Sequence, residues 1–263
     1  MSLDQLEYFR SLSSPPRDAL VGDGPVDCVD HTIHGYKGDE IVVSVIARKD
    51  HDRPGPGIYF LHGGGMVMGN RFAGAAPIVQ WAIKHDAVCV TVEYRLAPEH
   101  PGPTAVEDCH AGLVWMATQA QSLGIDPGRI VIFGGSGGGG LAAGCTLLAR
   151  DRGGPRLLGQ FLQCPMLDDR NETPSAHQYD GVGVWDRTST LTAWRAVLGA
   201  RCGGPGVSPY EAPARATDLR GLPPTFIDVG GAETFRDECI LFASRILAAG
   251  GECELQDVSM GYG

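Results

Sequence analysis

The chain has 263 residues, of which 43% are hydrophobic, so it can form one large domain with a sizeable core or two small ones. Its net charge is -10 and its pI is about 5.2, and an acidic surface repels polyphosphate, which argues against nucleic acid as a partner. No apolar run is long enough to span a bilayer, and the N-terminal residues lack the basic flank and apolar core of a signal peptide.

The eight cysteines are scattered along the chain, with no Cys-x-x-Cys pair. Most of them sit in apolar segments, such as Cys89 in "AVCVTV" and Cys164 in "FLQCP". This pattern predicts buried free thiols in a reducing, cytoplasmic compartment rather than a disulfide or zinc framework.

Short apolar runs alternate with longer helical patterns along most of the chain. Near-continuous apolar character predicts strands that are buried on both faces, as parallel strands are, whereas the run at 40–49 alternates like a half-exposed strand. The periodicity between the runs indicates helices. This β-α alternation predicts one doubly wound α/β domain. The predicted buried strands are 57–62, 87–94, 129–134, 158–164 and 225–230, and 253–258 is the last predicted strand. The predicted helices are 74–85, 104–122, 137–151 and 235–249.

Residues 165–222 break this alternation. They hold turn formers and a single clear helical pattern, near 190–198. Residues 1–25 contain a predicted helix followed by "SSPPRD". Open α/β sheets bind ligands at the carboxyl edge of their strands, so we expect both segments to form a cap over that edge.

The stretch "VIFGGSGGGGLAAG", 131–144, ends a predicted strand and begins a predicted helix. A phosphate-binding Walker loop needs a lysine after the glycines, and no lysine follows Lys84. The letters also fit a Gly-x-Gly-x-x-Gly dinucleotide motif, but the next predicted strand, "LGQFLQC", ends without the acidic residue that would bind the ribose. The remaining interpretation is a nucleophile elbow, Gly-x-Ser-x-Gly, with Ser136 at a sharp turn between strand and helix.

A second glycine motif supports the nucleophile interpretation. "HGGGMVMG", 62–69, follows an earlier predicted strand, and consecutive glycines expose backbone N–H groups without obstruction by side chains. Acyl transfer to a serine places negative charge on the former carbonyl oxygen, which such N–H groups stabilise. By position, the donors would be Gly64, Gly65 and Gly137, the residue after the serine.

Six motifs in this order resemble the hormone-sensitive-lipase-like branch of the α/β-hydrolases, most of which are carboxylesterases. They are "HGGGMVMG", "YRLAPEHP" (94–101), "AVEDC" (105–109), the serine elbow, "PMLDDR" (165–170) and "AETFRDE" (232–238). The resemblance covers nearly the whole chain and implies an eight-stranded, mostly parallel sheet, a cap, no cofactor and a small-molecule ester of short or medium acyl length as substrate. It also implies structural roles for His62, Arg95, Glu99 and Asp108. Gly135 and Gly137 stand where the family often has an acid and an alanine.

A serine nucleophile needs a histidine base and a carboxylate that orients the histidine. The acid belongs after the strand at 225–230, where we favour Glu233 over Asp237, because Asp237 falls one turn into the next helix. In the family, the histidine follows the last strand, and its position here falls at or next to Gly263. No histidine follows His177. The final histidine loop and helix are therefore expected to be missing from this sequence.

Two functional hypotheses follow from the resemblance. The first is a serine carboxylesterase whose activity is impaired because its catalytic histidine is missing from this sequence. The second is a small-molecule-binding homologue that has lost catalysis, like the plant gibberellin receptors, which lack the same histidine. The sequence does not determine the oligomeric state or the natural substrate.

Overall fold

The computed structural model describes residues 1–258, and these contain one eight-stranded sheet with the order β1-β2-β4-β3-β5-β6-β7-β8. β1 pairs antiparallel with β2, and β2 with β4, whereas every other neighbouring pair is parallel. The expected eight-stranded, mostly parallel sheet is therefore confirmed. The strands are β1 (Val26–His34), β2 (Glu40–Arg48), β3 (Gly55–Leu61), β4 (Val88–Val92), β5 (Ile125–Gly135), β6 (Gly159–Gln163), β7 (Thr225–Gly230) and β8 (Cys253–Val258).

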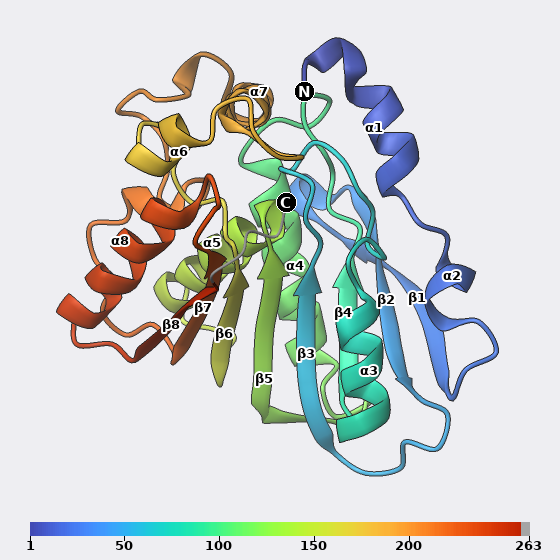
Figure 1. Ribbon diagram of the computed structural model, residues 1–263. Helices are drawn as coiled ribbons and strands as arrows, with labels where there is room; N and C mark the ends of the chain where they lie inside the picture. Colours follow the sequence, from blue (N-terminus) through green and yellow to red (C-terminus); the bar gives the residue numbers. More distant parts are fainter. Residues whose placement is uncertain (259–263) are drawn as a thin grey trace.

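Helices cover both faces of the sheet. In Figure 1, α3 lies in front of the sheet, whereas α4, α5 and α8 lie behind it. The central strands carry apolar side chains on both faces because both faces are covered; all five residues of β4 are buried. The helices are α1 (Leu6–Ser13), α2 (Arg17–Val21), α3 (Ala76–His85), α4 (Thr104–Thr118), α5 (Gly137–Asp151), α6 (Pro174–Gln178), α7 (Arg187–Leu198) and α8 (Arg236–Ala248).

Short 3₁₀ turns complete the secondary structure of the described residues. They are Leu3–Gln5, Tyr36–Gly38, Gly199–Arg201 and Pro213–Arg215. The hydrophobic core is divided by the sheet into two clusters. The larger contains Leu113, Leu148 and Phe242 from the rear helices, and the smaller contains Ile78 and Phe133 on the side of α3.

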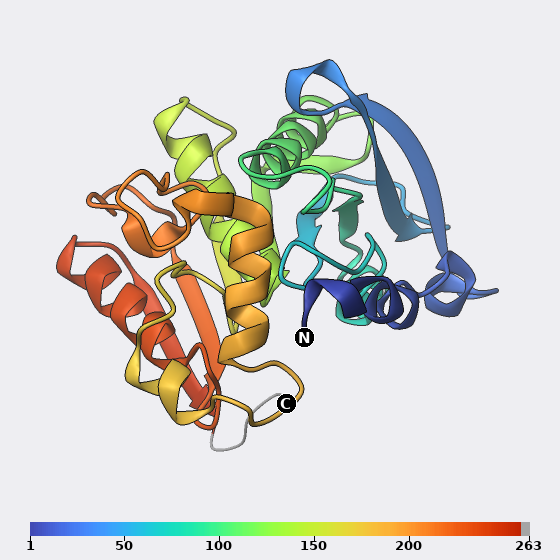
Figure 2. The ribbon, with the colours of Figure 1, turned by 90° about the horizontal axis from the view of Figure 1, so that it is seen from above.

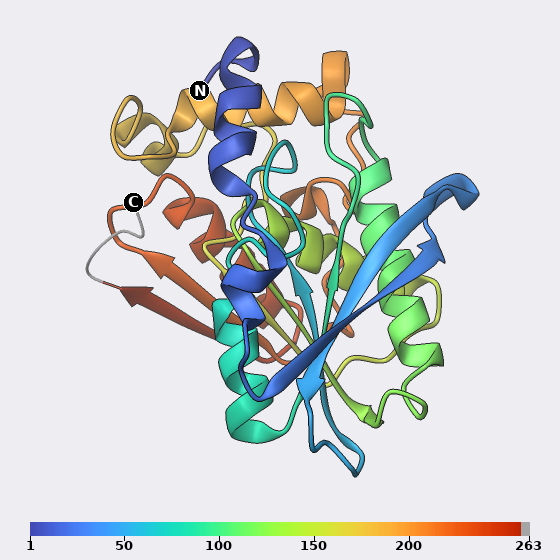
Figure 3. The same cartoon turned by 90° about the vertical axis from the view of Figure 1, so that its right-hand side faces the viewer.

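The structure contains one strand and two helices that the sequence analysis missed: β1, α2 and α6. β1 carries charged residues between its apolar ones, and its burial pattern is correspondingly irregular, because it forms the outer edge of the sheet. Together β1 and β2 form a long twisted ribbon, which Figure 3 shows from the side. α6 has only five residues, too few for a periodic pattern, although Thr173 caps it and Pro174 begins it.

Three helices outside the alternating β-α pattern lie at the end of the sheet where the parallel strands terminate. Figures 1 and 2 show α6 and α7 over that end, with α1 beside α7. The hydroxyl of Thr192 on α7 donates a 3.0 Å hydrogen bond to the carbonyl oxygen of Met1. Residues from both predicted cap segments are thus in direct contact, and their function as a cap stays a prediction.

Candidate functional site

Ser136 lies between β5 and α5, at the carboxyl end of the sheet. Its φ is 54° and its ψ is -122°, a conformation that non-glycine residues adopt only where the surrounding structure enforces it. The backbone N–H of Ser136 donates to the carbonyl oxygen of Gln163 at 2.8 Å, and its own carbonyl oxygen accepts from Met166 at 3.0 Å and Gly140 at 3.1 Å. These three hydrogen bonds hold the strained turn in place.

The glycines on either side of Ser136 allow close backbone packing. A Cβ atom on Gly134 would lie 2.2 Å from the carbonyl oxygen of Gly138, and a Cβ on Gly138 would lie 2.2 Å from that of Leu61. Glycine costs about 1 kcal/mol relative to alanine within a helix. The first turn of α5 retains glycines because any side chain there would collide with neighbouring backbone.

The loop after β3 brings its backbone close to the start of α5. A Cβ atom on Gly137 would lie 2.7 Å from the backbone nitrogen of Gly65, and one on Gly63 would lie 3.6 Å from the Cβ of Ser136. Gly64 and Gly65 have φ values of 104° and 60°, in the region that favours glycine. Gly64, Gly65 and Gly137, the predicted donors, are therefore grouped around Ser136.

These backbone amides are available for a ligand. Within residues 1–258, the N–H groups of Gly64 and Gly65 donate no hydrogen bond to the protein. Gly137 is the first residue of α5, so its N–H has no acceptor within the helix. The N-terminus of α5 also carries partial positive charge. This corner of the structure can stabilise a negative oxygen.

His62 lies beneath the glycine loop. Its ring stacks on Tyr94 with a centroid distance of 4.1 Å, its Nδ1 is 2.8 Å from the carbonyl oxygen of Gly63, and the Tyr94 hydroxyl donates to the His62 carbonyl oxygen. Burial lowers the pKa of His62 to about 4, which keeps the ring neutral at physiological pH. This environment suits a residue that supports the loop, as the family resemblance implies.

The other three residues with expected structural roles form ion pairs. Arg95 donates to both carboxylate oxygens of the fully buried Asp108, at 2.9 Å each. Glu99 binds Arg10 of α1, which also donates to the carbonyl oxygen of Val67 at 2.8 Å. Arg10 therefore connects the N-terminal helix to the glycine loop.

Ser136 lines two cavities, which we call the acyl-side cavity and the acid-side cavity. The acyl-side cavity has a volume of about 360 Å³ and the acid-side cavity about 220 Å³. The acyl-side cavity is lined mainly by Ser13, Phe60, Met68, Ala73 and Phe133, together with backbone of the glycine loop. The acid-side cavity is lined by Tyr179, Val182, Val184, Trp185, Glu233 and Phe235, among others.

Glu233 lies on the loop between β7 and α8 and lines the acid-side cavity with Ser136. Burial raises the pKa of its carboxyl group, and the backbone amides of Phe235 and Thr234 oppose this shift. No cation pairs with Glu233 within residues 1–258. Asp237 lines neither cavity. Its carboxylate accepts hydrogen bonds from the backbone N–H of Ser175 at 2.8 Å and from Arg236 at 2.9 Å.

None of the chain's eight histidines lines either cavity within the described residues. His177, the histidine nearest to the acid-side cavity in sequence, is 53% exposed and pairs with Glu172 at 2.9 Å. His51 binds Asp86, and His31 packs on Trp115. The position where the family histidine is expected, at or next to Gly263, lies outside the described residues.

The structure adds residues to the site that the sequence analysis did not assign to it. Cys164 was expected inside a buried strand, but it directly follows β6, is partly exposed and lines both cavities. Trp185 lies so close to Gly65 that a Cβ there would be 2.6 Å from the indole. The position of Cys164 at a strand end was a usable signal, whereas nothing in the sequence around Trp185 indicated its contact with the glycine loop.

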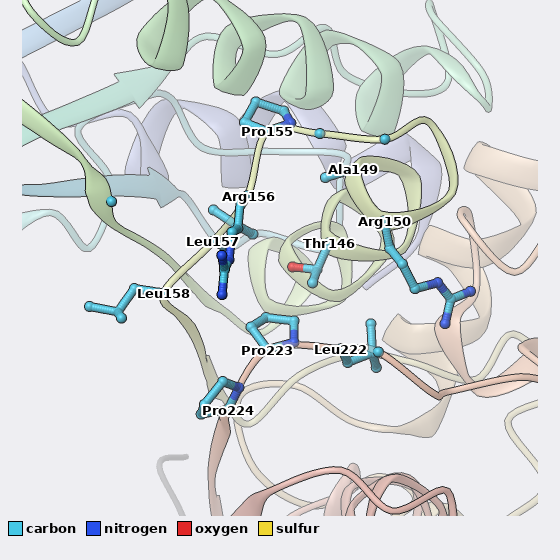
Figure 4. Close-up of a pocket in the computed structure, with 14 residues that line it drawn as sticks. Thr146, Ala149, Arg150, Pro155, Arg156, Leu157, Leu158, Leu222, Pro223 and Pro224 are labelled. Carbon is cyan, nitrogen blue, oxygen red and sulfur yellow. The ribbon is translucent and has the colours of Figure 1, made fainter.

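A cavity larger than either the acyl-side or the acid-side cavity lies elsewhere. It has a volume of about 770 Å³ and is formed near the amino ends of β6 and β7, where Leu157, Leu222, Pro223 and Pro224 line it (Figure 4). None of its lining residues lines a cavity at Ser136. Size alone therefore does not identify the chemical site.

Residues 1–258 contain no group of three histidine, cysteine, aspartate or glutamate residues arranged to hold a metal ion. They also contain no helix with the length and apolar character needed to cross a membrane. All eight cysteines are free, and five of them are buried.

A family model described as an alpha/beta hydrolase fold matches residues 58–261. Esterase LipI of Mycobacterium tuberculosis is 36% identical over 202 residues, which are 77% of this chain and 63% of LipI. Carboxylesterase NlhH of the same organism is 35% identical over 204 residues, which are 77% of this chain and 64% of NlhH. The chain thus spans less than two thirds of the length of these curated relatives.

Solved structures of esterases match more of the chain. A structure titled "Bacterial Heroin Esterase" is 37% identical, with a TM-score of 0.90 over 97% of this chain and 83% of that one. Brefeldin A esterase, titled a bacterial homologue of human hormone-sensitive lipase, is 29% identical, with a TM-score of 0.82 over 98% of this chain and 75% of that one. The relatives named here are esterases, so they do not favour the receptor-like hypothesis.

Proposed function

Because this chain belongs to the α/β-hydrolase fold family and matches carboxylesterases over most of its length, we propose that it is a serine carboxylesterase acting through an acyl-enzyme. The observation that carries the proposal is the grouping of the Gly65 and Gly137 backbones beside Ser136, which opens into two cavities. The proposed substrates are small-molecule esters of short or medium acyl length. A cavity of 360 Å³ lies at the lower end of the range for small-ligand pockets.

In the proposed mechanism, the Oγ of Ser136 attacks the ester carbonyl carbon. The carbonyl oxygen becomes negative and accepts hydrogen bonds from the N–H groups of Gly64, Gly65 and Gly137. Removing one such donor from a comparable hydrolase raises the barrier by about 3 kcal/mol. The alcohol then leaves, and water hydrolyses the resulting acyl-serine.

The proton of Ser136 must pass to a base and from that base to the leaving alcohol. We assign Glu233 as the carboxylate that orients this base, because it lines the same cavity as Ser136 and has no cation partner within residues 1–258. Asp237 is already committed to Ser175 and Arg236. The described residues place no histidine between Ser136 and Glu233, so we expect this chain alone to hydrolyse esters slowly.

Labelling with a fluorophosphonate probe tests the nucleophile. Because no histidine of the described residues lies beside Ser136, the probe should modify Ser136 slowly but selectively, as shown by mass spectrometry of the labelled peptide. The Ser136→Ala variant is the matched control, because it keeps the Cβ atom and the backbone turn. Labelling at another residue, or equal labelling of both proteins, would contradict the proposal.

Hydrolysis of p-nitrophenyl butyrate tests whether the reaction at Ser136 is limited by the lack of a base. Free imidazole should accelerate hydrolysis by the wild-type chain beyond the rate with Ser136→Ala, which corrects for imidazole's own reactivity. A chain extended after Gly263 by a histidine-bearing loop should gain more. Loss of one triad member in a comparable hydrolase lowers turnover by about 10⁴–10⁶-fold. No Ser136-dependent gain in either experiment would refute the assignment.

A further inference from the structure

Ser136 and Cys164 are the two residues that line both cavities, and every other lining residue belongs to one cavity. An ester bound at Ser136 has two substituents on its reacting carboxyl group, the acyl chain and the alcohol. Each substituent needs its own space beside the serine. The side chain at position 164 is therefore adjacent to both substituents at once.

We propose that the side chain of Cys164 is the partition between the two cavities and limits the size of both the acyl and the alcohol group. This inference rests on the proposed esterase function. It assigns a specificity-determining role to a residue that the catalytic mechanism does not use.

The direction of proton transfer tells which substituent occupies which cavity. The bond between Ser136 Oγ and the acyl carbon forms, and the bond between that carbon and the alcohol oxygen breaks. The base takes the Ser136 proton and gives it to the departing alkoxide. That base must lie against Glu233, which lines the acid-side cavity. The alcohol therefore belongs in the acid-side cavity and the acyl chain in the acyl-side cavity.

Cys164 is held rigidly enough to act as a wall. Its backbone N–H donates to the carbonyl oxygen of Asp228 at 2.5 Å, and its φ is 34°. The preceding residue, Gln163, accepts the 2.8 Å hydrogen bond from the N–H of Ser136. Gln163 also pairs with Gly135 and Asp228 in the sheet register. The positions of Cys164 and Ser136 are thus fixed relative to each other through the ends of β5, β6 and β7.

The chemistry of the thiol favours a steric role. Burial raises the pKa of Cys164 to about 12, and the nearby Glu233 carboxylate shifts it in the same direction. A thiol with such a pKa stays protonated at neutral pH and is a poor nucleophile. Cys164 therefore does not compete with Ser136 for the acyl group, and its size is what the substrate meets.

The test compares two ester series in the form of the protein that is active in the esterase assay. One series lengthens the acyl group of p-nitrophenyl esters from acetate to hexanoate, and the other lengthens the alcohol of acetate esters from ethyl to hexyl. Cys164→Leu should lower kcat/KM for the longest member relative to the shortest by at least about tenfold in both series. Cys164→Ala should raise the same ratio in both series.

Two matched controls touch one cavity each. Ala73→Leu should change only the acyl series, because Ala73 lines only the acyl-side cavity. Val182→Phe should change only the alcohol series, because Val182 lines only the acid-side cavity. The partition is refuted if these controls act as expected while both Cys164 variants shift one series or neither. Thermal unfolding shows whether Cys164→Leu is folded. If it is not, the two ester series measured with Cys164→Ala decide whether the partition holds.

A binding experiment separates this inference from the esterase proposal. In a Ser136→Ala background no turnover through Ser136 occurs, so dissociation constants for the same two series can be measured by tryptophan fluorescence. Adding Cys164→Leu should weaken binding of the longest member of both series by at least about tenfold relative to the shortest. If Cys164→Leu leaves the ratio of dissociation constants between the longest and shortest esters unchanged, the partition is refuted. If that ratio changes as expected but no protein with Ser136 hydrolyses esters, only the esterase function is refuted.

Discussion

The strained backbone at Ser136 predicts that removing its Cβ atom stabilises the protein. Ser136→Gly and Ser136→Ala both delete the hydroxyl, but only glycine accepts a φ of 54° with a ψ of -122° without strain. Such a conformation costs a non-glycine residue about 1–3 kcal/mol. Glycine also increases the entropy of the unfolded chain, which lowers the free energy of unfolding by about 0.4–1 kcal/mol relative to alanine.

The expected difference is the strain relieved minus this entropy. Ser136→Gly should therefore exceed Ser136→Ala in free energy of unfolding by roughly 0.5–2 kcal/mol. In a chain of this size, each kcal/mol shifts the Tm by about 2–4 °C. Urea unfolding, followed by circular dichroism, measures the difference between variants that are equally unable to react with a fluorophosphonate.

The result that would refute this reasoning is a glycine variant no more stable than the alanine variant. The turn would then be relaxed, and the hydrogen bonds to Gln163, Gly140 and Met166 would be holding a conformation that needs no enforcement. If the two variants differ in the slope of unfolding free energy against urea concentration, the substitution has changed the compactness of the folded or unfolded state instead.

Three further predictions concern the support of the site. Gly138→Ala should lower the free energy of unfolding by about 1–3 kcal/mol or more in urea melts, because its Cβ would meet the carbonyl oxygens of Leu61 and His62; wild-type stability would contradict the close packing. Burial raises the pKa of Glu238 well above its ordinary 4.5, so its neutral form suits the folded state. The contribution of Glu238 to the free energy of unfolding is full below pH 4.5 and falls as the pH rises toward the folded-state pKa. Glu238→Gln should flatten this decline when thermal unfolding is measured across pH. An unchanged dependence of stability on pH would refute the prediction. Arg10→Met should increase amide hydrogen exchange in residues 1–16, because α1 loses its bonds to Val67 and Glu99, while exchange in β5 stays the same; equal exchange in both proteins would show that Arg10 does not hold α1.

The parts of the fold that the sequence predicted are those with strong local signals. The strand at 225–230 and the helix at 137–151 have the same bounds in the structure, and the family assignment is confirmed by the match over 58–261. β1 was missed because alternating charges on an edge strand resemble loop composition. α6 was missed because five residues do not complete a periodic pattern, despite the Thr173 cap.

The site shows the same division between local and spatial information. The glycines around Ser136 were predicted because the conformation of the turn and the close approach of backbones restrict those positions to glycine. Cys164 and Trp185 contact the site through tertiary packing, which leaves little trace in the surrounding sequence. Glu233 was favoured as the carboxylate because of its place after β7, and this role stays a prediction. In the structure Glu233 lines a cavity with Ser136, whereas Asp237 is bound to Ser175 and Arg236.

The two cavities are built from distant parts of the chain, with Ser13 in one and Phe235 in the other. This has a consequence for biosynthesis. A ribosome adds about 5–20 residues per second, so Ser136 and its turn are made several seconds before the residues that enclose the second cavity. During that interval Ser136 is present without the residues that complete the second cavity. The proposed reactivity toward esters would thus be a late property of the nascent chain.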